Sequence, residues 1–193
     1  MNQGLLTGEK TAAVQKLLED LQQKKTTAVY DLPESQAIYL AALITRITGK
    51  RVLLVLPNDL AASKETEDAQ QLVGNASACL PSGEIELGRG VSSHENTWRR
   101  LETLQKVVSG ETKLLCVSMD AMLRRMASPD QFKQALLRLA PGDRIMPDQL
   151  MSQLLRMGYE RVEMVEGKGQ CALRGSIVDC YPPAGSVALR LEF

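Results

Sequence analysis

The stretch RVLLVLPND, residues 51–59, decides the fold class of this chain. The run Arg51–Leu56 is rich in β-forming residues, which is typical of a strand buried on both faces of a parallel sheet. Pro57 ends the strand, and Asn58 and Asp59 provide the N-terminal cap of a helix predicted over residues 59–73. The stretch therefore predicts a strand followed directly by a helix, the unit from which α/β folds are built.

The same alternation extends on both sides of this stretch. Amphipathic spacing predicts helices over residues 11–25, 33–48, 95–109 and 118–126. Apolar runs predict strands over residues 26–31 and 113–117. Residues 74–97 are rich in glycine and serine and predict a long connection. This order of elements indicates an α/β fold with a parallel sheet and right-handed crossovers.

The pattern changes after residue 128. A helix is predicted over residues 147–157, and short strands are predicted over residues 136–139, 161–165, 170–181 and 187–193. Strands this close together are typical of an antiparallel α+β sheet. We therefore predict a parallel α/β domain at residues 1–135 and the start of a small α+β domain at residues 136–193. Because the last strand ends on the apolar Phe193, we expect this second domain to be truncated at its C-terminus.

The composition excludes several classes of protein. The chain has 193 residues, of which 44% are hydrophobic and 24% charged, and this is ordinary for a globular protein. Its 23 basic and 23 acidic residues balance, so only weak, salt-sensitive DNA binding is expected. No apolar run approaches the roughly 18–20 residues that span a bilayer, and the polar start has no signal-peptide pattern. We therefore expect a cytoplasmic protein without membrane contact.

The four cysteines and the single histidine offer little for metal or redox chemistry. The cysteines are widely spaced without a C-x-x-C pair, which argues against a zinc site or a disulfide framework. We expect Cys79, Cys116 and Cys180 to pack in the core as reduced thiols. His94 has no cysteine or second histidine nearby in the sequence with which to form a site. The sequence predicts no metal site and no catalytic residue.

A family resemblance is carried by residues 158–193. The matching positions are Gly158-Tyr159-x-Arg161-Val162-x-x-Val165, Gly169, Arg174-Gly175-x-x-x-Asp179-x-Tyr181-Pro182 and Leu189-Arg190-Leu191-Glu192-Phe193. Their spacing closely resembles the N-terminal region of bacterial transcription-repair coupling factors (the Mfd family) and, more loosely, the excinuclease component UvrB. The stretches RVLLVLPNDLAA and LLCVSMDAMLRR look like their counterparts in both families.

The resemblance implies an organisation and a function. It implies that residues 1–135 form a degenerate, UvrB-like domain similar to half of a helicase motor core, and that residues 136–193 begin the domain that binds the excinuclease component UvrA. Full-length family proteins bind RNA polymerase and DNA and carry an ATP- and Mg²⁺-dependent motor in regions outside these residues. The family acts on RNA polymerase stalled at DNA damage and couples transcription to nucleotide excision repair. In this interpretation the present chain recruits UvrA and has no motor activity of its own.

A phosphate-binding loop is the feature that a motor domain needs and that this sequence lacks. Such a loop has the pattern G-x-x-x-x-G-K-[ST], in which backbone N–H groups surround the phosphates while the Lys and the hydroxyl serve phosphate and Mg²⁺. Where UvrB has this loop, residues 30–37 have the sequence YDLPESQA. In this segment, which begins at Tyr30, Pro33 lacks a backbone N–H that could bind phosphate. Gln36 and Ala37 stand where the pattern has the Lys and the hydroxyl residue. The sequence predicts no bound ATP or Mg²⁺ and no enzymatic activity for this chain.

The resemblance assigns three residues of the second domain to partner binding. Arg174 and Arg190 align with arginines through which the family binds UvrA, and Phe193 is assigned to the same surface. The alternation Leu189-Arg190-Leu191 places Arg190 on the polar face of its strand, and the planar fork of arginine suits pairing with carboxylates. Without the resemblance, both arginines would be interpreted as solvated side chains. Whether they share a face depends on the hairpin register, which the sequence leaves open.

Two other interpretations remain open. One is an ATP-dependent DNA-binding domain like that of UvrB, which the altered loop at residues 30–37 argues against. UvrB also needs aromatic residues in the loop corresponding to residues 74–97 in order to stack on bases, and this segment has none. The other is a structural remnant that only supports the rest of a longer protein. Binding to purified UvrA distinguishes this remnant from the adaptor.

Overall fold

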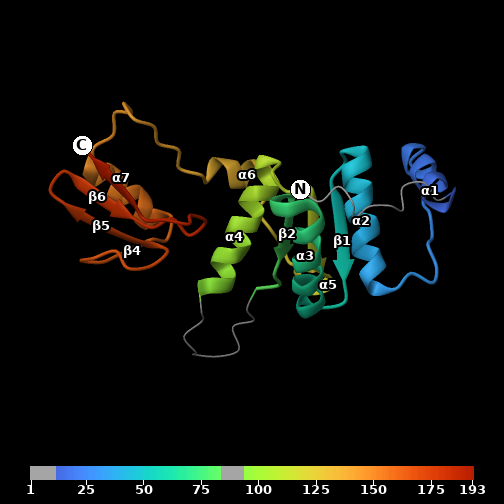
Figure 1. Ribbon diagram of the computed structural model, residues 1–193. Coiled ribbons are helices and arrows are strands. Elements are labelled where there is room, and N and C mark those ends of the chain that lie inside the picture. The colour runs from blue at the N-terminus through green and yellow to red at the C-terminus, as the bar shows by residue number, and fades with distance from the viewer. Residues whose placement is uncertain (1–11, 84–93) are drawn as a thin grey trace. The chain divides into compact units, whose positions relative to one another are not determined.

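The computed structural model describes residues 12–83 and 94–193. The described residues form two compact units, of which the first comprises residues 12–83 and 109–124 and the second residues 94–108 and 125–193 (Figure 1). This division differs from a single boundary at residue 135, because residues 94–108 and 125–135 belong to the second unit. Residues 84–93 of the predicted long connection lie outside the described residues. Within the described ranges, no helix combines the length and apolar character needed to cross a membrane.

The first unit contains a three-stranded parallel sheet. Its strands are β1 (Val52–Leu56), β2 (Ser77–Leu80) and β3 (Leu114–Ser118), in the order β1-β3-β2. Its helices are α1 (Ala12–Gln22), α2 (Glu34–Thr48), α3 (Asp59–Val73), α5 (Met119–Leu123) and the short 3₁₀ helix η2 (Gly74–Ala76). Both strand pairs are parallel, which confirms the predicted parallel α/β arrangement.

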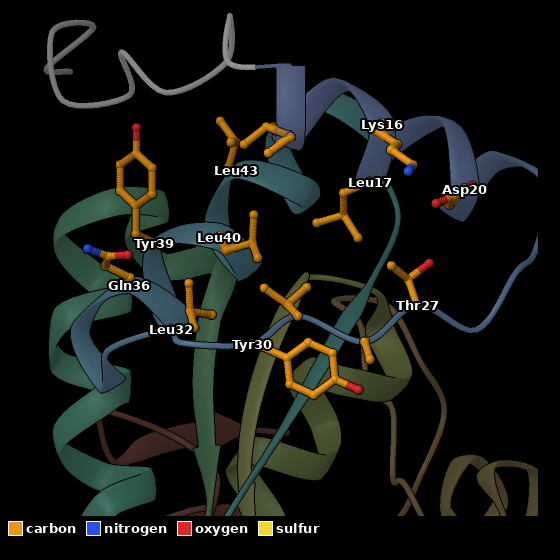
Figure 2. A pocket seen from close by; sticks show the side chains of 14 residues that line it. Lys16, Leu17, Asp20, Thr27, Tyr30, Leu32, Gln36, Tyr39, Leu40 and Leu43 are labelled. Carbon is orange, nitrogen blue, oxygen red and sulfur yellow. The ribbon is translucent and has the colours of Figure 1, made fainter.

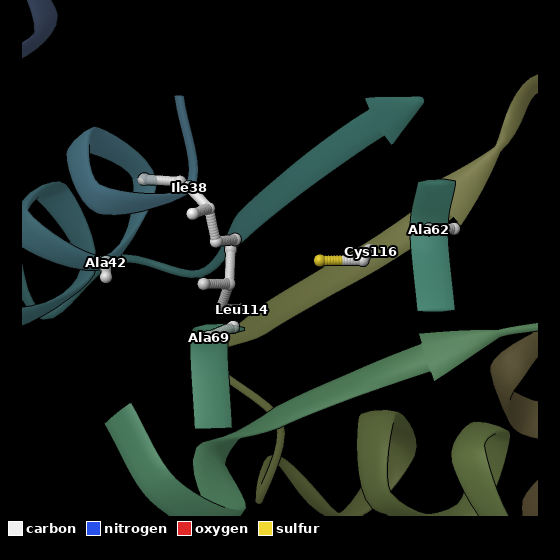
Figure 3. Packing of buried hydrophobic residues seen from close by; sticks show 7 residues of the cluster. Ile38, Ala42, Ala62, Ala69, Leu114 and Cys116 are labelled. Carbon is white, nitrogen blue, oxygen red and sulfur yellow. The ribbon is translucent and has the colours of Figure 1, made fainter. Parts of the chain in front are cut away.

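Small residues let α2 and α3 pack closely against this sheet. Ala42 of α2 and Ala62 and Ala69 of α3 are fully buried around Leu114 and Cys116 of β3 (Figure 3). Alanine loses no side-chain entropy on burial, so burying these residues costs little conformational entropy. Burial raises the pKa of the Cys116 thiol to about 11. This cysteine therefore stays protonated and packs as a small apolar residue, as the sequence predicts.

Asp59 joins the carboxyl ends of the strands. Its side chain accepts hydrogen bonds from the backbone N–H and the hydroxyl of Ser82, at 2.9 and 2.6 Å, and from the hydroxyl of Ser118. The preceding residue, Asn58, caps α3 by accepting a hydrogen bond from the N–H of Ala61 at 2.9 Å. The strand-to-helix junction predicted from the sequence is therefore also the place where the ends of β1, β2 and β3 are connected.

Three predictions for the first unit are wrong. Residues 26–31 form no strand, because no described strand offers them hydrogen-bonding partners, and Tyr30 remains 82% exposed. Strand β1 is not buried on both faces, since Leu53 and Val55, which share one face, are 53% and 39% exposed. The connection predicted at residues 74–97 contains β2, whose four residues are too few to show a pattern of their own.

The second unit contains a four-stranded mixed sheet. Its strands are β4 (Glu160–Arg161), β5 (Gln170–Arg174), β6 (Ile177–Cys180) and β7 (Leu189–Glu192), in the order β4-β5-β6-β7. Its helices are α4 (His94–Ser109), α6 (Pro129–Gln134) and α7 (Pro147–Arg156). The pairs β5–β6 and β6–β7 are antiparallel, which agrees with the predicted antiparallel sheet. Strands β4 and β5 are parallel instead, because residues 162–169 return the chain to the same end of the sheet before β5 begins. The single strand predicted over residues 170–181 is wrong, because the chain turns at Gly175 and Ser176 and forms two strands.

Helix α7 covers one face of this sheet (Figure 1). Its apolar residues Leu150, Met151 and Leu154 are buried against side chains of β5 and β6. The thiol of Cys171 lies 3.5 Å from the sulfur of Met151 within this core, and Cys180 is buried in the same cluster. One face of the sheet is therefore buried in the core of the second unit.

Residues 136–139 form no strand, because helix α6 ends just before them and Leu137 packs against the α7 core instead of pairing in a sheet. The helix begins with a capping box. The hydroxyl of Ser128 accepts a hydrogen bond from the N–H of Gln131 at 3.3 Å, and the Gln131 side chain accepts one from the N–H of Ser128 at 3.0 Å. Together with Pro129 at the first helical position, this box begins a helix where the sequence pattern predicts only a change of fold type.

The single tryptophan of the chain connects α4 to the sheet of the second unit. The ring of Trp98 lies against Gly169, where an added Cβ would be 3.3 Å from the ring carbon Cζ2. Beside this contact, Lys168 approaches Glu102 of α4 at 4.0 Å. Gly169 also has a φ of +78°, in the region that favours glycine. Two independent constraints therefore require glycine at this turn.

Replacing Gly169 by alanine tests this contact. Gly169→Ala should lower the free energy of unfolding by about 1–2 kcal/mol through the backbone alone, and its methyl group should displace Trp98 and shift the fluorescence emission. Gly158→Ala is the matched control, because Gly158 has a φ of +91° but nothing within 4 Å of an added Cβ. In a denaturant titration it should cost a similar free energy, with unchanged emission. Identical native emission spectra for both variants would show that Trp98 does not pack on Gly169.

Candidate partner-docking site

A two-residue turn sets the geometry of the hairpin formed by β5 and β6. Arg174 pairs with Ile177, so only Gly175 and Ser176 connect the two strands. Gly175 has a φ of +60° and Ser176 does not have a positive φ, which is the combination found in a type II′ turn. Because loop length and turn type fix the register of a hairpin, this turn determines which side chains share a face of the sheet.

Both arginines assigned to partner binding lie on the same face of the sheet. Across the strands β5, β6 and β7, one row of paired residues is Ala172, Asp179 and Arg190, and the adjacent row is Arg174, Ile177 and Glu192. Residues two apart on a strand share a face, so Arg174 and Arg190 project from the same side, diagonally across β6. Helix α7 packs against the opposite side. The register thus answers the question that the sequence leaves open.

Asp179 holds Arg190 in a bidentate ion pair. Nε and Nη2 of Arg190 donate to Oδ1 and Oδ2 of Asp179 at 2.8 and 2.9 Å. The side chain of Arg190 is 59% exposed and that of Asp179 is 15% exposed. The hydrogen bonds from Arg190, together with the positive charges of Arg190 and Arg174, hold the pKa of the Asp179 carboxyl below its usual value. The carboxylate is therefore ionised at neutral pH, and the guanidinium faces solvent with its remaining donors.

Arg174 is held by the segment that precedes β5. Its Nη2 donates to the backbone carbonyl of Glu163, within residues 162–169, which contain no helix or strand. Arg174, Asp179 and Arg190, which we call the arginine face, line a cavity of about 490 Å³. Four apolar residues complete the lining: Met164, Val165, Ala188 and Leu189. The site therefore combines two cationic forks, one carboxylate and an apolar wall.

Comparison with known protein families identifies the part of the chain that carries this site. Residues 137–193 match the family model described as the UvrB interaction domain. This segment is therefore similar to UvrB interaction domains. The match contains the whole arginine face, the β5–β6 hairpin and helix α7.

The chain as a whole is similar to two kinds of protein. It is 30% identical to the transcription-repair-coupling factor of Bacillus subtilis over 82% of its own length, and 24% identical to that of Haemophilus influenzae over 84%. It is 26% identical to UvrABC system protein B of Chlorobium limicola over 96% of its length. The chain spans 14% of each of these coupling factors and 30% of this system protein B. The predicted resemblance to these families is confirmed.

Phe193 lies apart from Arg174 and Arg190. It follows the last residue of β7, its N–H donates to the carbonyl of Ser176 at 3.1 Å, and its side chain is 45% exposed. It does not line the cavity of the arginine face. Strand alternation places it on the side of Leu191, which packs against the α7 core. The structure thus brings together two of the three residues assigned to partner binding.

The residues predicted to replace a phosphate-binding loop lie in the first unit, beside a larger cavity of about 780 Å³ (Figure 2). Tyr30 and Gln36 line this cavity, together with apolar residues of α1 and α2 such as Leu17 and Leu40. Pro33 precedes α2, and its carbonyl accepts hydrogen bonds from the N–H groups of Gln36 and Ala37 at 2.9 and 3.2 Å. These two N–H groups are therefore already paired within the chain, and the cavity beside them has a mainly apolar wall.

Other titratable groups of residues 137–193 are held in unreactive states. Burial raises the pKa of the Cys171 and Cys180 thiols, and it raises the pKa of the Tyr159 hydroxyl to about 12. Protonated thiols are poor nucleophiles and poor metal ligands. Within residues 12–83 and 94–193, no group of three or more His, Cys, Asp or Glu residues could hold a metal ion. The distinctive chemistry of the domain therefore lies in the charges and shape of the arginine face.

The ion pair of the arginine face can be tested by titration. A carboxyl with a lowered pKa stabilises the native state at pH values above its unfolded pKa, and this contribution is lost as the pH falls through the lower native pKa. The carboxyl carbon of Asp179 should therefore titrate below the usual aspartate range in NMR spectra, and Arg190→Gln should move it upward. Arg144→Gln, a change outside the sheet, should have no effect. An unchanged Asp179 titration in Arg190→Gln would show that the pair does not form in solution.

Proposed function

We propose that this chain is a docking module for UvrA in nucleotide excision repair, and that it acts as the non-motor part of a transcription-repair coupling factor. The observation that carries this proposal is the arginine face: Arg174 and Arg190 project from the open side of the segment that matches the UvrB interaction domain, beside an apolar groove. Arginine is enriched at the energetic centres of protein interfaces, where its planar fork binds carboxylates. UvrA would contact this face directly.

The first unit supports an adaptor better than a motor. Its parallel sheet is compatible with a degenerate half of a helicase core, while residues 30–37 lack the Lys, hydroxyl and glycines of a phosphate-binding loop. We infer that this chain is not an enzyme and binds neither ATP nor Mg²⁺. Contacts with RNA polymerase and DNA would then belong to other regions of the longer relatives. The adaptor would work in the cytoplasm, where bacterial transcription and excision repair take place.

Charge reversal on the arginine face tests the docking proposal. Arg190→Ala should weaken binding to purified UvrA by roughly 30-fold, because truncating a central interface arginine costs about 2 kcal/mol or more. Arg190→Glu and Arg174→Glu should weaken binding further through repulsion between like charges. Calorimetry or a pull-down measures the affinities, and circular dichroism should remain like that of the parent chain.

The matched control for this experiment is Arg144→Glu, which makes the same charge change on an exposed residue of the second unit outside the sheet. It should retain the parent affinity. If both arginine-face Glu variants bind UvrA as tightly as the parent chain, UvrA docks elsewhere. If the parent chain itself does not bind, the chain is not an adaptor.

Nucleotide binding separates the adaptor from a domain like UvrABC system protein B. No saturable binding of a fluorescent ATP analogue is expected at micromolar concentrations. Gln36→Lys alone should not create binding, because Pro33 still lacks an N–H and its carbonyl still accepts the N–H groups of Gln36 and Ala37. Saturable micromolar binding by the parent chain would favour the ATP-dependent alternative.

A further inference from the structure

We propose that Asp179 is a positioning residue for partner recognition: it holds Arg190 so that the free end of the guanidinium receives a carboxylate of the partner. An aliphatic side chain of the same partner segment would occupy the adjacent cavity. This inference rests on the proposed docking of UvrA at the arginine face. It adds the chemistry that the partner must present, which is an acidic residue next to an aliphatic one.

The geometry of the ion pair defines which donors are free. A guanidinium has five N–H donors, and Arg190 uses the edge formed by Nε and Nη2 to bind both carboxylate oxygens of Asp179. The three donors left, two on Nη1 and one on Nη2, form the end of the side chain. Because Asp179 is mostly covered and Arg190 mostly exposed, the open end is the part that a partner can reach.

The direct pairing of Asp179 with Arg190 on neighbouring strands makes this arrangement stiff. Two parallel hydrogen bonds fix the plane of the guanidinium as well as its position. A free arginine on an exposed strand would have many rotamers, and binding would have to immobilise it. Asp179 orders the side chain before the partner arrives, so that this cost is reduced at the moment of binding.

The lining of the cavity favours an acidic protein segment over a nucleic-acid backbone. Met164 lines this groove and is 62% exposed, so the groove offers apolar surface next to the cations. Asp179 would repel the closely spaced phosphates of a nucleic acid, whereas a single carboxylate reaches the far end of Arg190. Glu192 also lies on this face, two residues beyond Arg190, and further limits the negative charge that the face accepts.

A double-mutant cycle with UvrA tests the role of Asp179. Asp179→Ala should weaken binding by about 3–10-fold, the range expected when one flexible side chain must be ordered on binding. In the Arg190→Ala background, the same change should have less than about a 2-fold effect, because there is no guanidinium left to position. Asp179→Asn, which keeps one acceptor for Arg190, should lie between the parent and Asp179→Ala.

Glu192→Gln provides the matched control for charge. It removes a negative charge from the same face without touching the hydrogen bonds of Arg190, so binding should stay equal or become tighter. Tighter binding by Asp179→Ala would show that Asp179 competes with the partner and would overturn the proposal. An equal loss from Asp179→Ala in both backgrounds would also overturn it, because Asp179 would then act independently of Arg190.

A second measurement does not depend on UvrA. In the parent chain, the Arg190 Nε–H signal should be ordered on the nanosecond scale by NMR, and it should shift when a peptide of alternating glutamate and leucine is added. In Asp179→Ala the signal should be mobile and the shift smaller at the same peptide concentration. Equal order in both chains would contradict the positioning role. Absence of UvrA binding with this NMR behaviour intact would reject the proposed function alone.

Discussion

The register of the β5–β6–β7 sheet is the constraint on which the arginine face depends. The two-residue turn at Gly175 and Ser176 leaves no slack in the hairpin, and the pairing of Asp179 with Arg190 continues the same register into β7. A slip of one residue would move Arg190 to the side covered by α7, where an arginine would be buried without a partner. The same strand pairing therefore determines both the fold of the small domain and the positions of its arginines.

The opposite side of the sheet keeps this register in place. Leu150, Met151 and Leu154 of α7 fit against small and medium side chains of β5 and β6, including Cys171, Val178 and Cys180. A shift of the pairing by one residue would bring polar residues of the strands against α7 and expose this apolar set. Because the core side and the arginine face alternate along the same strands, burial on one side specifies exposure on the other.

Helices were easier to predict from this sequence than strands. The periodic residues and end signals of α3 and α7, such as Asn58 and Gly158, depend only on nearby sequence, so their bounds follow from it. A strand also needs a partner, which is why residues 26–31 look like a strand but form none, and why β4 pairs in the parallel sense. For the site, the family resemblance identified Arg174 and Arg190. That they share a face could be established only from the register of the strands in the structure. Asp179 stands in the matched motif, but nothing local indicates that it binds a residue eleven positions away.

The two arginines have different relations to the rest of the domain, and this difference shapes the groove between them. Arg174 holds the carbonyl of Glu163 and so fixes residues 162–169, whose Met164 and Val165 form the apolar wall. Among the described residues, Arg190 binds Asp179, a neighbour on the sheet, and this exposed ion pair contributes little to folding. Loss of Arg174 would therefore remove a positive charge and release the segment that forms the apolar wall of the groove. Loss of Arg190 would affect the recognition of the partner alone. The same side chains that offer charge to a partner also build the surface on which that partner would rest.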